Sequence, residues 1–108
     1  MPSEERLDEA YERARAAYDD DREPVALELL SEYVRHRPEH GHAWYLLGDC
    51  LRILGLPHEA ERALNRALGL APDHARWAIE ARIGRTHADA GNHDVAEHWF
   101  ATAACTPP

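Results

Sequence analysis

The most constraining feature of this sequence is that it repeats at a nearly fixed interval. A set of small, apolar and proline residues recurs after 34 positions and again after a further 36. The first copy consists of Ala14, Ala26, Leu30 and Pro38, the second of Gly48, Ala60, Leu64 and Pro72, and the third of Gly84, Ala96, Phe100 and Pro108. Such a period is typical of stacked helical units, each of which needs a neighbour to bury its apolar face. The sequence therefore predicts three similar units, with two additional residues between Pro72 and Glu80.

Each unit is expected to form two helices. In the second unit the apolar residues between Trp44 and Leu54 follow helical spacing, and Gly55 occupies the position where a helix commonly ends. Pro57 suits the first turn of the next helix, where a missing N–H costs nothing. Similar signals in the other units, including a candidate N-cap at Asn92, predict six helices. Their expected ranges are 3–19, 22–36, 41–54, 57–70, 74–89 and 93–105.

The small residues of the repeat have a mechanical role in this interpretation. Two helices that cross closely need a contact without bulky side chains, so Gly48 and Ala60 are expected to face each other with Leu64 beside them. The two additional residues before Glu80 are expected to lengthen the fifth helix, and Trp77 to fill the joint that they open.

The composition indicates a single all-α domain over residues 1–108. The strong helix formers Ala, Leu, Glu and Arg dominate, whereas the strand formers Val, Ile, Thr and Phe are scarce. The net charge of −8 argues against a nucleic-acid partner, whose phosphates require an excess of Lys and Arg. No apolar run is long enough to span a bilayer, and the acidic N-terminal residues differ from a signal peptide. We therefore expect a cytoplasmic protein with no membrane partner.

Catalysis, a cofactor and a metal site are not expected. The sequence has no nucleophile–base set and no Gly-rich phosphate loop, which argues against an enzyme. His36, His40 and His42 gather around a predicted turn, but no Cys is near and no zinc-type spacing is present, so polar turn surface is the simpler interpretation. Cys50 and Cys105 lie in helical patterns beside apolar residues, which predicts two buried thiols.

The motif of the second unit resembles that of tetratricopeptide repeat proteins. It runs Trp44-x-x-Leu47-Gly48-x-x-Leu51 and continues with Ala60, Leu64, Ala67 and Pro72. The resemblance covers nearly the whole chain, with repeats at about 7–40, 41–74 and 77–108, of which the first is degenerate and the third has Glu80 at the Trp position. It implies an α-solenoid, a right-handed superhelical stack of three antiparallel helix pairs. It also implies a non-enzymatic scaffold for protein–protein interaction.

The resemblance further implies that the first helix of each pair lines a concave groove. The positions carried over are Tyr11, Arg15, Tyr18, His42, Tyr45, Asp49, Arg52, Ala78, Ala81, Arg82, Arg85 and Asp89. Several of them are spaced four and three residues apart, which places them on one helix face. Tyr and Arg anchor many interfaces, and guanidinium groups bind carboxylates. We therefore expect the groove to bind a peptide that carries acidic groups, or a helix of another protein.

An alternative function concerns the C-terminal end of the stack. Solenoids usually end in a helix with a polar outer face, and no such helix is predicted after the sixth. Val95, Trp99 and Phe100 are therefore expected to lie partly open. This end would suit self-association into a homodimer, or it would mark a boundary inside a longer tetratricopeptide repeat protein.

Overall fold

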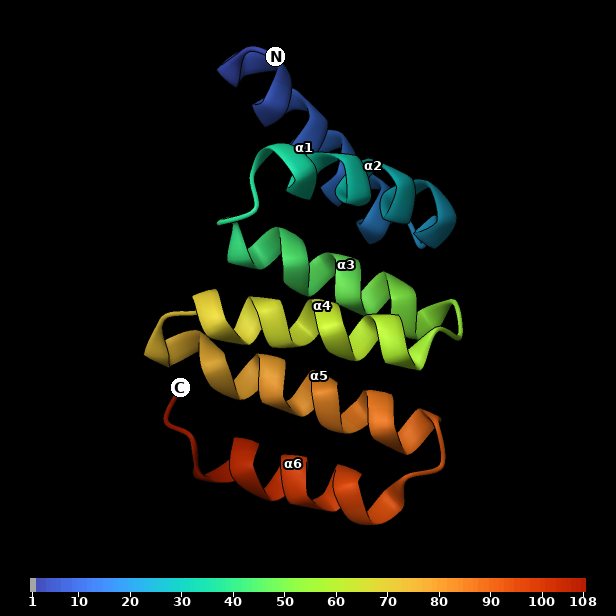
Figure 1. The fold of residues 1–108 in the computed structure, drawn as a ribbon, viewed down its shortest axis with the longest axis vertical. Coiled ribbons are helices and arrows are strands. Elements are labelled where there is room, and N and C mark those ends of the chain that lie inside the picture. The colour runs from blue at the N-terminus through green and yellow to red at the C-terminus, as the bar shows by residue number, and fades with distance from the viewer. Residues whose placement is uncertain (1) are drawn as a thin grey trace.

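The computed structural model describes residues 2–108, which form six α-helices joined by short turns (Figure 1). The helices are α1 (Glu4–Asp19), α2 (Glu23–His36), α3 (Gly41–Ile53), α4 (Pro57–Leu70), α5 (Arg76–Asp89) and α6 (His93–Cys105), and a single 3-10 turn, η1 (Asp73–Ala75), precedes α5. Successive helices form three antiparallel pairs stacked along the long axis of a body measuring 43 × 28 × 21 Å. The predicted all-α stack of three helix pairs is confirmed.

The turn inside each pair has the same backbone geometry in all three copies. It is made by Asp21, Gly55 and Gly91, whose φ angles are +56°, +81° and +85°. The next residue of each turn donates its backbone N–H to the carbonyl five residues earlier, at 2.8–2.9 Å. Gly reaches this left-handed conformation without a steric penalty, whereas Asp pays one. Asn92 occupies the N-cap position that follows Gly91, but its side chain makes no capping hydrogen bond, so the predicted cap is wrong in this respect.

The helices of a pair cross at the small residues of the repeat, as predicted. A Cβ atom at Gly48 would lie 2.6 Å from Cγ of Leu64 and 3.2 Å from the carbonyl oxygen of Ala60. At Gly84 a Cβ atom would lie 2.8 Å from the ring of Phe100. Real side chains do not approach so closely, and therefore only Gly permits these two crossings in their present form.

The buried core forms two clusters along the stack. One lies mainly among α1, α2 and α3, and the other between α4 and α5. Trp44 and Tyr45 of α3 pack against both clusters and connect them. The indole Nε1 of Trp44 donates to the carbonyl of Pro38 at 2.8 Å, and the guanidinium of Arg66 lies 5.0 Å from the indole centroid. Trp44 thus fixes α3 to the preceding turn and to α4.

The joint before α5 differs from the prediction. The additional residues form the 3-10 turn η1, and α5 begins at Arg76, so they do not lengthen the fifth helix. Trp77 does not fill the joint, because its exposed fraction is 44%. Residues two apart on an α-helix point in nearly opposite directions. Ile79 is buried in the core, and the indole of Trp77 consequently faces outward.

Only one of the two thiols is buried. Cys50 is inaccessible in the core, where burial raises the pKa of its thiol to about 12. The prediction of a second buried thiol is wrong, since Cys105 is exposed. Cys105 is the last residue of α6, and among the described helices the backbone of α6 approaches only that of α5. None of the helices in residues 2–108 combines the length and apolar character needed to cross a bilayer.

Candidate functional site

The first helices of the three pairs approach one another on one side of the stack. Within residues 2–108, Cα atoms of α1 and α3, and of α3 and α5, approach within 8 Å, whereas no Cα atoms of α2 and α4 or of α4 and α6 come that close. The stack is therefore closed more tightly on the side of α1, α3 and α5, which is its inner side. The residues predicted for the groove are carried by these three helices. We refer to nine of them as the inner row: Tyr11, Arg15, Tyr18, His42, Tyr45, Asp49, Arg52, Arg82 and Arg85.

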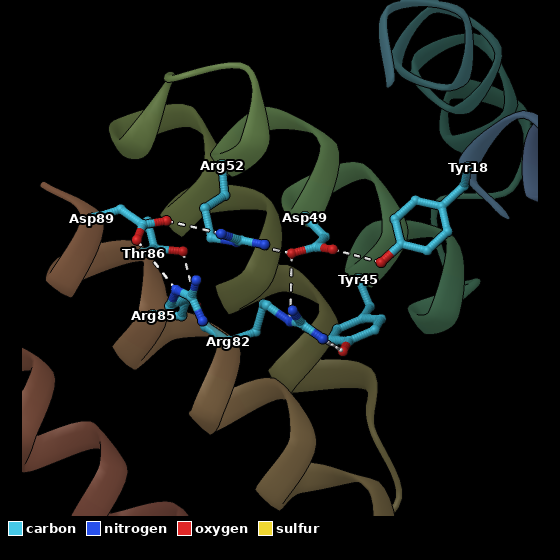
Figure 2. Close-up of polar contacts among 8 residues, drawn as sticks. All are labelled: Tyr18, Tyr45, Asp49, Arg52, Arg82, Arg85, Thr86 and Asp89. Atoms are coloured by element: carbon cyan, nitrogen blue, oxygen red, sulfur yellow. Dashed lines mark hydrogen bonds and ion pairs between the residues drawn. The ribbon is translucent and has the colours of Figure 1, made fainter. Parts of the chain in front are cut away.

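Asp49 is the centre of the inner row (Figure 2). Its exposed fraction is 1%, yet its carboxylate has three polar partners. The hydroxyl of Tyr18 donates to Oδ2 at 2.5 Å, and Nε of Arg52 donates to Oδ1 at 2.9 Å. Nε of Arg82 lies 3.4 Å from the same Oδ1. One buried side chain therefore connects all three helices of the inner side.

A second carboxylate extends the network toward the C-terminal end of α5. Nη1 of Arg52 donates to Oδ2 of Asp89 at 2.8 Å, and Nε of Arg85 donates to Oδ1 at 3.2 Å. Burial alone would raise the pKa of Asp89, but the hydrogen bonds and charges of Arg52 and Arg85 outweigh it and hold the pKa below its usual range. Arg52 thus bridges two carboxylates, and its side chain is only 12% exposed.

The other three guanidinium groups remain accessible. Arg82 donates from Nε and Nη2 to the hydroxyl of Tyr45, at 3.3 and 2.9 Å, and keeps 33% of its side chain exposed. Arg15 is 48% exposed and lies 5.9 Å from the ring centroid of Tyr11. Arg85 is 62% exposed. These three groups can each donate further hydrogen bonds to a ligand, since a guanidinium carries five N–H groups.

The N-terminal end of the inner row is a cluster of aromatic and imidazole rings. The hydroxyl of Tyr11 is 2.6 Å from Nδ1 of His42, and the ring of His42 stacks on Tyr45 with centroids 5.9 Å apart. His40 and Tyr33, which were not predicted as site residues, also belong to this cluster. Their side chains form a 2.7 Å hydrogen bond with each other, and both rings lie against Tyr11. Burial lowers the pKa of both His40 and His42, which favours the neutral imidazoles.

The histidines of the predicted turn do not converge on one point. Nε2 of His36 is 3.2 Å from the carboxylate of Glu32, whereas His40 and His42 each bond to a different tyrosine hydroxyl. Among the described residues, no group of three or more His, Cys, Asp or Glu side chains is arranged to hold a metal ion.

The C-terminal end of the stack is partly apolar. Val95 and Phe100 of α6 have exposed fractions of 44% and 41%. Trp99 is half-buried and packs against the core cluster that contains Leu64 and Ile83. Val95 and Phe100, predicted to lie partly open, are thus exposed, while Trp99, predicted likewise, is half-buried and also contributes to the packing of the last pair.

The paired helices, their Gly crossings and the polar row along the first helices define a helical-repeat protein. The chain belongs to the tetratricopeptide repeat family, whose model matches residues 11–75 and 54–108. Members of this family are in general protein–protein interaction modules, typically without enzymatic activity. A comparison with curated protein sequences finds no significant match.

Several solved structures of the protein MamA share the fold. The structure titled MamA MSR-1 superimposes with a TM-score of 0.84 at 23% identity, over 91% of this chain and 55% of that one. A MamA mutant gives a TM-score of 0.87 at 22% identity, over 94% and 73%. MamA AMB-1 gives 0.81 at 23% identity, over 91% and 52%. The chain thus spans about half the length of two of these structures, and the likeness concerns the fold.

Proposed function

We propose that the chain is a non-enzymatic scaffold whose inner side binds an extended or helical segment of another protein. Carboxylates of that segment bind the accessible guanidinium groups of Arg15, Arg82 and Arg85. The proposal rests chiefly on one observation, the fixing of Tyr and Arg side chains from three helices in one row by the buried carboxylate of Asp49. Side chains held in place before binding lose less conformational entropy when a ligand arrives.

The charge of this surface supports an acidic ligand. The inner row and Asp89 hold four guanidinium groups and two carboxylates, an excess of two positive charges (four minus two) in a chain of net charge −8. Glu12 approaches Arg15 only to 3.9 Å and is itself 69% exposed, so it screens that guanidinium weakly. Arg and Tyr are also among the residue types most enriched where binding energy concentrates at protein interfaces.

A displayed library of random peptides tests the proposal. Peptides enriched on the wild-type chain are expected to contain Asp or Glu and to bind the Arg15→Gln/Arg85→Gln variant at least about 10-fold more weakly, since two charge-assisted contacts are lost. The matched control is Arg35→Gln/Arg62→Gln, which removes the same charge from exposed positions on α2 and α4. Equal loss in both variants, or no enriched peptide, would overturn the proposal.

A second candidate function is self-association through α6. It is favoured by the exposed side chains of Val95 and Phe100 on a helix whose backbone, within the described residues, approaches only that of α5. Light scattering during size exclusion separates the two candidates. A dimer that dissociates in Val95→Ser would support self-association, and a monomer at high concentration would eliminate it.

A further inference from the structure

An apolar pocket of about 390 Å³ lies beside the inner row, where α3, the end of α4 and the start of α5 meet. Its lining includes His42, Tyr45, Ala67, Leu70, Ala78 and Ile79. Leu70 borders it with an exposed fraction of 42%. The volume lies at the lower end of the range found for ligand pockets and is ample for one large apolar side chain.

The repeat explains why the pocket is open. Ala67 lies 34 positions after Tyr33, and Ala78 lies 36 positions after His42, so the two joints between pairs can be compared side chain by side chain. At the first joint Tyr33 is 5% exposed, and its ring lies 5.1 Å from that of Tyr11. Rings therefore occupy the first joint, whereas methyl groups stand at the corresponding positions of the second.

The pocket and the inner row share a side chain. The ring of Tyr45 lines the pocket, and its hydroxyl accepts the hydrogen bond from Nη2 of Arg82 at 2.9 Å. Arg82 also follows Ala78 by one turn of α5, a separation of about 6 Å along the helix axis. An apolar side chain in the pocket would therefore have a guanidinium within one helical turn.

We infer that the pocket receives a bulky apolar side chain of the partner segment, and that Arg82 receives an acidic side chain two residues away. An extended chain advances about 3.3–3.6 Å per residue, so two residues cover the distance from Ala78 to Arg82. Side chains two apart in an extended segment also point to the same side. The inference rests on the proposed function, and it names the occupant as an extended segment with an apolar and an acidic residue at this spacing.

An array of synthetic peptides tests the inference. Each peptide carries one leucine and one glutamate, separated by none, one, two or three serines, and a parallel set has serine in place of leucine. The labelled wild-type chain is expected to bind best when one serine intervenes, roughly 10-fold better than the peptide without leucine. Ala78→Phe fills the pocket and should remove this preference, whereas Ala101→Phe, at an exposed position on α6, should leave it intact.

The outcomes separate this inference from the proposed function. If peptides with glutamate alone bind as well as those with leucine, and binding still depends on Arg15 and Arg85, the pocket has no role while the proposed function stands. If no peptide of the array binds the wild-type chain, the inference is overturned. The random peptide library then tests separately whether the inner side binds peptides. Should Ala78→Phe fail to fold, Leu70→Ser removes an apolar contact from the pocket rim and must weaken only the leucine-containing peptides.

Discussion

The hydroxyl of Tyr18 on α1 donates a hydrogen bond of 2.5 Å to the buried carboxylate of Asp49 on α3. This bond joins the first helix pair to the second on the inner side of the stack. Because the same carboxylate is bonded to Arg52 and lies 3.4 Å from Arg82, it also helps to fix Arg82, one of the three guanidinium groups that we propose as ligand contacts. The stability of the stack and the geometry of the inner row therefore depend on one acidic side chain.

Replacing Asp49 by Ala is expected to destabilise the chain by about 2–4 kcal/mol, since Arg52 loses a buried partner and Arg82 a nearby one. Tyr18→Phe removes one hydrogen bond to the carboxylate but leaves Arg52 paired with it, and should cost less, about 1.5 kcal/mol. Urea unfolding followed by circular dichroism measures both values. Equal effects of the two substitutions would contradict the central position of Asp49.

Substitution by Ala should lower the stability of the chain at Gly48 and raise it at Gly69. A Cβ atom at Gly48 would overlap Leu64, and the strain should cost about 1–3 kcal/mol. Nothing lies within 4 Å of a Cβ atom at Gly69, so Gly69→Ala should stabilise α4 by about 0.5–1 kcal/mol through helix propensity alone. The melting temperatures of both variants, compared with that of the wild type, test these two predictions. A stabilising Gly48→Ala would show that the crossing is looser than described.

Glu80 is expected to destabilise the core of the third pair. It is 4% exposed, and its Oε1 is buried without a hydrogen-bond partner. Glu80→Met keeps a similar volume and removes the unsatisfied atom, and we expect it to raise the free energy of unfolding by about 1–2 kcal/mol. Chemical denaturation of the variant provides the measurement. A loss of stability would mean that the carboxylate has a favourable role that the contacts do not reveal.

The free energy of unfolding should decrease as the pH drops through the weakly acidic range, because of His40 and His42. Burial holds their folded-state pKa values below the ordinary value of about 6.5, so the unfolded chain binds more protons as the pH drops below that value. Their contribution is complete above about pH 6.5 and is lost as the pH falls through the folded-state pKa values. Melting temperatures between about pH 7.5 and about pH 5.5 should decline less steeply in His40→Gln/His42→Gln than in the wild type. If the melting temperatures of the two proteins decline in parallel, protonation of these imidazoles is not linked to folding.

The sequence was sufficient to predict the fold, because the repeat places Gly or Ala at every crossing and a turn residue at every hairpin. It was less informative where one copy departs from the others. Asp21 adopts the positive φ that Gly55 and Gly91 adopt, and only alignment of the copies reveals this. The side chain of Trp77 points inward or outward according to whether the additional residues extend α5 or form η1. The spacing of apolar residues does not distinguish these two structures.

The residues of the candidate site could be proposed from the sequence, whereas the contacts between them could not. The resemblance to tetratricopeptide repeats assigned Tyr18, Asp49 and Arg82 to the inner helices, but the distances between helices follow from packing. The ring of Tyr33 was missed because it belongs to α2, a helix not expected to reach the groove. Its replacement by Ala67 in the next repeat was the available signal for the open pocket.

The most direct test of a binding role for the inner side is the map of amide chemical-shift changes when an enriched peptide is titrated into the labelled chain. We expect the perturbed amides to lie on α1, α3 and α5, with the largest changes near Arg15, Tyr45, Arg82 and Arg85. Changes concentrated on α6 around Val95 and Phe100 would contradict this expectation, and would assign binding to the C-terminal end of the stack.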